Sequence, residues 1–131
     1  MQAVLDALEG LNLDRREAPM ADEDAIARVH PVRYIEALEL AFAEAREGRV
    51  RLDPDTYISA GSREAAYRAA GACVAAVDAV LTGEDQMAFC AVRPPGHHAE
   101  PLAAMGFCIF NNVAIAALHA LHARGLARVA I

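Results

Sequence analysis

The stretch that decides the fold runs from Arg93 to Asn112 and has two parts. The first part is Arg93-Pro94-Pro95-Gly96-His97-His98-Ala99-Glu100, and the second is Met105-Gly106-Phe107-Cys108-Ile109-Phe110-Asn111-Asn112. An apolar run of strand length, residues 87–92, precedes it, and residues 112–123 form a helical run after it. The loop between them leaves the carboxyl end of the predicted strand, where open α/β sheets bind ligands. The stretch therefore predicts a site as well as a fold.

Apolar runs on either side of the helix predict a βαβ unit. The continuous apolar run 87–92 is typical of a strand covered on both faces of a parallel sheet. A second apolar run begins at Ala127, after Gly125 ends the helix. We expect a right-handed crossover between the two strands. The predicted fold class is therefore α/β, with a parallel sheet and flanking helices.

The residues before this unit predict a mainly helical first part. Residues 62–81 form a long alanine-rich helix that Gly71 interrupts. A glycine costs roughly 1 kcal/mol relative to alanine in a helix, so we expect close packing against a neighbouring element there. Residues 53–57 are rich in turn formers. Shorter helices are expected over residues 1–9, after Asp22, and from Pro31 to a stop near Gly48.

Composition excludes several classes of function. The chain has 131 residues, which fits one domain, and its net charge of −6 argues against nucleic-acid binding. It contains no apolar run of about 18 residues that would span a membrane. The amino terminus carries Asp6 and Glu9 but no basic residue, unlike a secretory signal. The cysteines are widely spaced, without a CxxC pair, so we expect a reducing, cytoplasmic compartment.

Adjacent histidines, His97 and His98, are the leading catalytic candidates. In an extended loop they would face opposite ways, so we do not expect them to chelate one metal. A turn at Pro95 and Gly96 would still let both flank one substrate. Histidine is the natural general base near neutral pH, with an ordinary pKa of about 6.5. The alternative is that both imidazoles bind the loop backbone and hold its shape, and spacing alone leaves both interpretations open.

Other residues with reactive side chains have simpler interpretations. His119 and His122 lie three apart on a helix without a third ligand at metal-site spacing, so a solvated helix face is expected. His30 precedes a proline and is expected to pack or cap. Cys108 paired with His98 would make a metal-free thiol hydrolase. The apolar neighbours of Cys108 favour inert burial instead.

The two-part stretch resembles the zinc-dependent histone deacetylase family, specifically its class II members and the bacterial deacetylase-like amidohydrolases. The resemblance continues through Val113 and Ala114. Further matches lie at Val29-His30-Pro31, Tyr34-Ile35, Leu52-Asp53-Pro54-Asp55-Thr56-Tyr57, Ala69-Ala70-Gly71-Ala72 and Arg128-Val129-Ala130-Ile131. It covers nearly the whole chain but only the front part of the family's catalytic domain. We therefore expect residues 1–131 to be a partial domain, truncated after Ile131 and also at the amino terminus.

This resemblance implies an arginase-deacetylase type of fold and hydrolysis of an N-acetylated amine, either acetyl-lysine or an acetylated polyamine. Zinc in the family polarises the acetyl carbonyl and activates a water molecule. The resemblance implies that His98 is the general base and later acid, with His97 as its electrostatic partner. It implies that the Gly106 carbonyl accepts the substrate amide N–H, that Phe107 lines the tunnel, and that Asp55 holds the substrate backbone.

The metal ligands of the family have no counterpart in the chain. They come from an Asp-x-His at the end of the strand that begins here at Ala127, and from a later aspartate. We therefore expect zinc in a longer protein, and neither bound zinc nor activity for this chain alone. The alternative is a non-catalytic binding or scaffold module that retains the early part of the domain. An exposed strand edge makes an oligomer possible.

Overall fold

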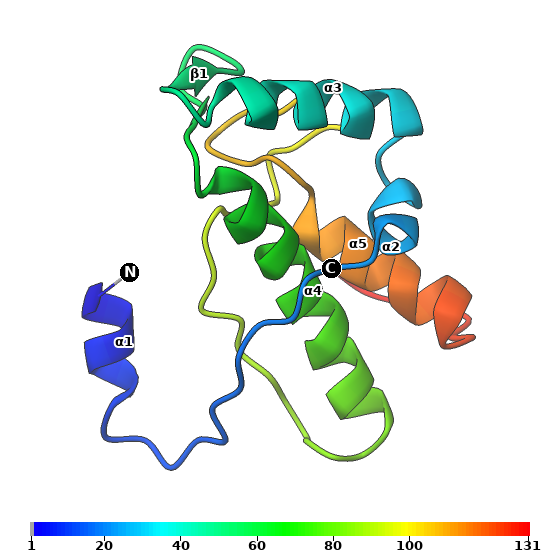
Figure 1. Cartoon of the computed structure of the whole chain (residues 1–131). Coiled ribbons are helices and arrows are strands. Elements are labelled where there is room, and N and C mark those ends of the chain that lie inside the picture. The colour runs from blue at the N-terminus through cyan, green and yellow to red at the C-terminus, as the bar shows by residue number, and fades with distance from the viewer. Residues whose placement is uncertain (1) are drawn as a thin grey trace.

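Helices form the frame on which the two-part stretch rests, and the structure, a computed structural model, describes residues 2–131 (Figure 1). Met1, the first residue of the first predicted helix, lies outside the described residues. In chain order the elements are α1 (Gln2–Leu8), α2 (Glu23–Ala27), α3 (Val32–Glu44), β1 (Val50–Arg51), β2 (Tyr57–Ile58), α4 (Ser62–Leu81), α5 (Asn112–Leu118) and the π-helix η1 (His119–Ala123). No helix within residues 2–131 is both long and apolar enough to cross a bilayer.

The core lies between α4, α5 and the elements that cover them. α5 packs mainly against α4, and α3 crosses near the amino-terminal end of α4 (Figure 1). Tyr67 of α4 meets the ring of Phe110 edge-on, with 5.3 Å between the ring centroids. Glu39 of α3 accepts hydrogen bonds from Arg63 at 2.7 Å and from the Tyr67 hydroxyl at 2.8 Å. The fully buried apolar side chains include Ile26, Ile58, Phe110 and Ile115.

Gly71 lies where the segment before α2 crosses α4. A Cβ atom added at Gly71 would lie 2.1 Å from the carbonyl oxygen of Pro19 and 2.7 Å from the backbone nitrogen of Ala21. That backbone N–H donates to the Tyr67 carbonyl at 3.0 Å, which fixes the crossing segment in place. The prediction that Gly71 allows close packing is confirmed.

Replacing Gly71 with alanine is expected to lower the free energy of unfolding by about 2 kcal/mol. The substitution gains about 1 kcal/mol of helix propensity. The clash is with backbone atoms of Pro19 and Ala21, which cannot yield as a side-chain tip would, so its cost is expected at the upper end of the usual range, about 3 kcal/mol. Urea unfolding measures the change. Gly48→Ala is the matched control, since nothing lies within 4 Å of its added Cβ, and a more stable Gly71→Ala protein would contradict the packing.

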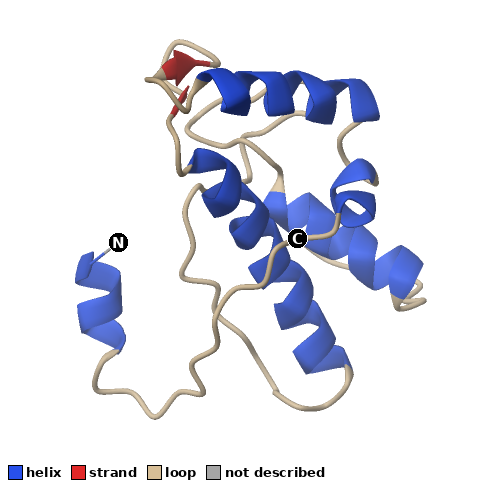
Figure 2. Cartoon of the chain, viewed as in Figure 1, coloured by secondary structure: helices blue, strands red, loops and turns tan. Residues whose placement is uncertain are grey.

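Neither strand of the predicted βαβ unit is formed within residues 2–131. Residues 87–92 and 127–131 run as loops, and the one ladder is the short antiparallel pair of β1 and β2 (Figure 2). An isolated extended segment is not a stable strand, because its backbone groups need a hydrogen-bonded neighbour. The apolar runs stay open to solvent, with Met87 84% and Phe89 73% exposed. The prediction of strands at these two runs is wrong for this structure.

The predicted helix over residues 112–123 changes type at His119, where α5 becomes η1. His119 is buried, and its Nε2 atom lies 2.6 Å from a carboxylate oxygen of Asp78. Arg124 donates to the same oxygen at 2.7 Å. The hydrogen bond from Arg124, together with that to His119, lowers the pKa of Asp78 to about 2 against the opposing effect of burial. The expected solvated face is therefore wrong for His119, whereas His122 is exposed.

Candidate active site

His97 and His98 occupy a tight turn rather than an extended loop. The Ala99 N–H donates to the Gly96 carbonyl at 3.2 Å, which closes a turn around the two histidines. Their ring centroids lie 4.1 Å apart with the planes tilted by 45°, and both residues are exposed. The turn replaces the opposed orientation expected of an extended loop, so the two imidazoles can face the same ligand.

Two asparagines fix this turn to the start of α5. The Asn111 side-chain oxygen accepts from the Ala114 N–H at 3.1 Å and so caps the helix, while its amide nitrogen donates to the Ala99 carbonyl at 2.9 Å. Asn112 donates to the Pro94 carbonyl at 3.3 Å. A Cβ atom added at Gly96 would lie 2.5 Å from the Asn112 nitrogen, so only glycine permits this approach. These anchors were not predicted from the sequence.

Gly106 lies directly against His98. A Cβ atom added at Gly106 would fall 2.7 Å from Cδ2 of His98, and Gly106 has a φ of +57°. Both facts favour glycine, because other residues rarely adopt this backbone conformation. The Gly106 carbonyl oxygen accepts a contact from Sγ of Cys108 at 3.4 Å. The structure therefore brings together His97, His98 and Gly106, three of the five predicted site residues.

Phe107 has an unusual backbone conformation that a hydrogen bond supports. Its φ of +65° places a bulky residue in the left-handed region, which costs of order 1–3 kcal/mol. The Phe107 N–H donates to the buried hydroxyl oxygen of Thr56 at 3.0 Å. Thr56 in turn donates to the Asp55 carboxylate at 3.2 Å. Asp53 holds this second loop by accepting from the N–H groups of Asp55 and Thr56 at 2.9 and 2.6 Å.

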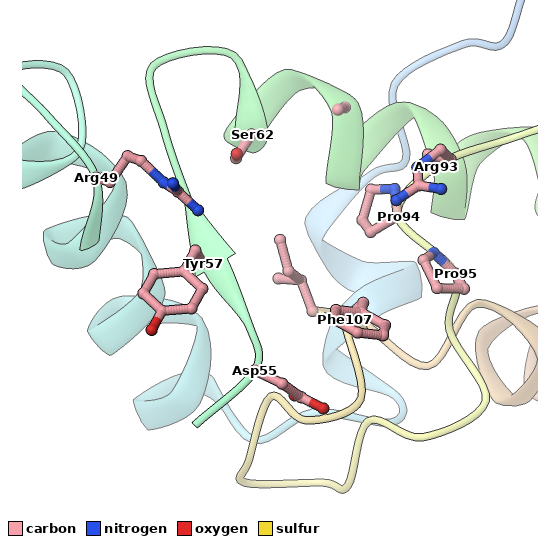
Figure 3. A pocket seen from close by; sticks show the side chains of 10 residues that line it. Arg49, Asp55, Tyr57, Ser62, Arg93, Pro94, Pro95 and Phe107 are labelled. Atoms are coloured by element: carbon pink, nitrogen blue, oxygen red, sulfur yellow. The ribbon is translucent and has the colours of Figure 1, made fainter. Parts of the chain in front are cut away.

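Asp55 and Phe107, the other two predicted site residues, line one pocket of about 370 Å³ (Figure 3). Its other lining residues are Arg49, Tyr57, Ser62, Ala65, Arg93, Pro94, Pro95 and Ile109. His97, His98 and Gly106 are not among them. The adjacent residues Gly106 and Phe107 thus connect two groups, because Gly106 lies against His98 while Phe107 lines the pocket.

His30 connects the two parts of the stretch from inside the protein. It is fully buried, and its Nε2 accepts the Asn111 N–H at 2.9 Å, so its Nδ1 carries the proton and donates to the Pro101 carbonyl at 3.1 Å. Tyr34 stacks on the ring at 5.1 Å and donates from its hydroxyl to the Ile109 carbonyl at 2.7 Å. The expectation that His30 packs is confirmed, but its role in holding the loop was not predicted.

Acidification is expected to weaken the fold through His30. Burial lowers the pKa of His30 below its ordinary value of 6.5, and the neighbouring Tyr34 stays neutral because burial raises its pKa. The unfolded chain then binds more protons, so the stabilisation is complete above about pH 6.5 and is lost as the pH falls below it. Urea unfolding at several pH values between 7.5 and 5 measures the loss. His30→Gln should flatten this dependence, whereas His122→Ala should leave it unchanged.

Two other chemistries, metal binding and thiol catalysis by Cys108, depend on how the described residues are placed. Among residues 2–131, no three His, Cys, Asp or Glu side chains lie close enough together to hold a metal ion. These residues therefore do not fit a zinc site by themselves. Cys108 is fully buried, with its sulfur against the Gly106 carbonyl. This burial disfavours the thiol hydrolase hypothesis, since a substrate would not reach the sulfur.

Comparison with known proteins identifies the family of the chain. The model of the histone deacetylase domain family matches residues 1–131. The chain belongs to the histone deacetylase family. It is 44% identical over 119 residues to a histone deacetylase-like amidohydrolase of Pseudomonas aeruginosa, and 39% identical over 144 residues to the polyamine deacetylase HDAC10 of Mus musculus. The solved structure of the HDA15 HD domain superposes with a TM-score of 0.80 at 34% identity.

This deacetylase-family chain matches only part of each relative. The alignments cover 91% of the chain but 30% of the amidohydrolase, and 100% of the chain but 21% of mouse HDAC10. The superposition covers 94% of the chain and 33% of the HDA15 chain. The predicted fold class is confirmed: the helices and the small antiparallel sheet are a portion of the α/β deacetylase fold.

Proposed function

We propose that this chain contributes the histidine-pair side of the active site of a zinc-dependent enzyme that hydrolyses an N-acetylated amine. The observation that carries the proposal is the Gly96–Ala99 turn, which sets His97 beside His98, while His98 lies against Gly106. Relatives that are named deacetylases support the same reaction class. Acetyl-lysine and acetylated polyamines are the proposed substrate kinds, and the cytoplasm is the proposed compartment.

His98 is proposed to move the protons of this reaction. Hydrolysis adds water to the acetyl carbon, breaks the C–N bond, and releases acetate and the amine. An imidazole nitrogen of His98 would take a proton from the attacking water and return it to the leaving nitrogen. His97, 4.1 Å away between ring centroids, would stabilise the charge that His98 gains. The exposed rings and the contact with Gly106 support this division of roles.

The remaining proposed roles concern substrate binding. The Gly106 carbonyl would accept the amide N–H of the acetylated side chain, and the exposed Phe107 ring would pack on its aliphatic stem. Asp55 would accept backbone N–H groups of the substrate. Zinc would supply Lewis-acid chemistry, but the described residues lack a ligand set for it, so the roles assigned to this chain concern only its own groups.

An acetate-release assay tests the proposal in the protein that carries this chain. We expect turnover of an acetyl-lysine peptide that a zinc chelator abolishes and added zinc restores. The 131-residue chain alone is expected to show no turnover. Binding of the peptide without hydrolysis, at any zinc concentration, would favour the scaffold alternative. Turnover that persists in chelator but stops on thiol alkylation would favour the cysteine hydrolase.

A further inference from the structure

We propose that the pocket beside Phe107 selects acetylated peptides that carry an acidic residue next to the acetylated lysine. Arg49 and Arg93 would bind the carboxylate of that neighbour (Figure 3). This inference rests on the proposed deacetylase function and narrows its substrate class. It assigns a specificity role to two arginines outside the histidine pair.

The charge of the pocket lining is the first argument. Arg49 reaches the pocket from the segment before β1, and Arg93 from the loop that follows α4 (Figure 3). Asp55 is the one acidic side chain among the residues that line the pocket. Two guanidinium groups against one carboxylate leave the lining net positive in a chain whose overall charge is −6. A positive pocket in an acidic protein favours an anionic ligand group.

The availability of both guanidinium groups is the second argument. Arg63 and Arg124 form ion pairs of 2.7 Å with Glu39 and Asp78. Within the part of the chain that the structure describes, neither Arg49 nor Arg93 lies within ion-pair distance of a carboxylate. The Arg49 guanidinium instead lies over the Tyr57 ring, 4.9 Å from its centroid. The ring orients Arg49 without neutralising it, so its donors remain free for a ligand.

The two proposed substrate kinds differ in the charge that they would bring to this pocket. Arginine pairs with a carboxylate through two parallel N–H···O bonds. An ammonium group of a ligand cannot take the place of the carboxylate, because it has no acceptor for these bonds. An acetylated polyamine carries ammonium groups, and the two arginines would repel them. A peptide offers backbone N–H groups to Asp55, and an acidic neighbour offers a carboxylate to Arg49 and Arg93. Only the acidic peptide satisfies both kinds of group in the lining.

The test uses the protein that carries this chain and three acetylated probes. Two are acetyl-lysine peptides that differ only by Glu or Gln next to the acetyl-lysine, and the third is acetylspermidine. An exposed ion pair changes affinity by a factor of roughly 2 to 5, so two arginines predict about a tenfold preference in kcat/KM for the Glu peptide. Acetylspermidine should be the poorest of the three. The Glu preference should shrink as the ionic strength rises.

Substitutions of Arg49 and Arg93 test whether these two residues cause the preference for the Glu peptide. The selectivity ratio is kcat/KM for the Glu peptide divided by kcat/KM for the Gln peptide. Arg49→Gln is expected to reduce this ratio by roughly two- to fivefold, and Arg93→Gln by a similar factor. Arg49→Lys keeps the charge and should retain part of the ratio. Arg51→Gln is the matched control, because Arg51 is exposed on β1 and does not line the pocket. The ratio should not change in this control.

Binding measurements separate failure of this inference from failure of the proposed function. If the protein deacetylates the two peptides equally, or prefers acetylspermidine, the selectivity is refuted while the deacetylase function stands. If it deacetylates none of the probes, fluorescence anisotropy of the labelled peptides decides. A preference for the Glu peptide that Arg49→Gln reduces would support the selective pocket without catalysis. Equal Kd values for the two peptides would overturn the inference.

Discussion

His98→Ala is expected to lower kcat for an acetyl-lysine peptide at least a hundredfold in the protein that carries this chain. A positioned general base contributes roughly 10²–10⁴-fold in rate, and His97 is the neighbouring imidazole among the described residues. KM should change little, since the exposed His98 ring lies outside the pocket beside Phe107. Steady-state kinetics with zinc present measure both parameters.

His122→Ala is the matched control for this prediction. His122 is an exposed histidine of η1, outside the turn that holds His97 and His98. Its removal should leave kcat within a factor of about two. His97→Ala should cost less than His98→Ala, because the partner does not itself carry the proton. Full activity of the His98→Ala protein would refute the assignment of the general base.

The second large effect is expected from His30→Ala, which should lower the free energy of unfolding by about 3–5 kcal/mol. The substitution removes the partner of the Asn111 N–H and of the Pro101 carbonyl in two part-buried hydrogen bonds, and a buried group left unpaired costs about 1–3 kcal/mol. It also opens a cavity beside Tyr34 and Phe110, whose rings lie 5.1 and 5.6 Å from the imidazole between centroids.

Urea unfolding of the His30→Ala protein measures this loss. Val32→Ala is the control, because Val32 is 62% exposed at the start of α3 and buries little surface. Its effect should stay within about 0.5 kcal/mol. Since His30 holds Asn111, and Asn111 holds Ala99 beside the histidine pair, kcat should also fall in His30→Ala below the unfolding transition. A His30→Ala protein as stable as the Val32→Ala control would contradict this account.

Features encoded by local pattern were predicted well from the sequence. The helix over residues 62–81 matches α4, because helix formers fill it and Gly83 follows with a φ of +78°. Gly71 was notable because glycine destabilises the interior of a helix, and the backbone that crosses α4 at this position explains its presence. The five site residues came from the family resemblance, and two of them, His97 and Gly106, lie against a third, His98.

Features that depend on distant partners were not predictable in this way. The strand at residues 87–92 was inferred from apolar content, but a strand also requires a neighbour, which these residues lack here. The buried pairing of His119 with Asp78 joins residues 41 positions apart, so helical spacing alone suggested an exposed face. The turn at His97 and His98 depends on Asn111 and Asn112, whose polar side chains read equally well as solvated loop residues.

The hydroxyl of Thr56 gives the pocket a mechanical property. It links the Phe107 backbone to the Asp55 loop through two hydrogen bonds. These two segments line the pocket, so the hydrogen bonds hold its two sides at a fixed separation. Releasing Phe107 would also remove the support of its strained backbone. A bulky inhibitor linker would have to break these hydrogen bonds to widen the pocket. Linker width, more than linker length, should therefore limit the affinity of compounds built for this pocket.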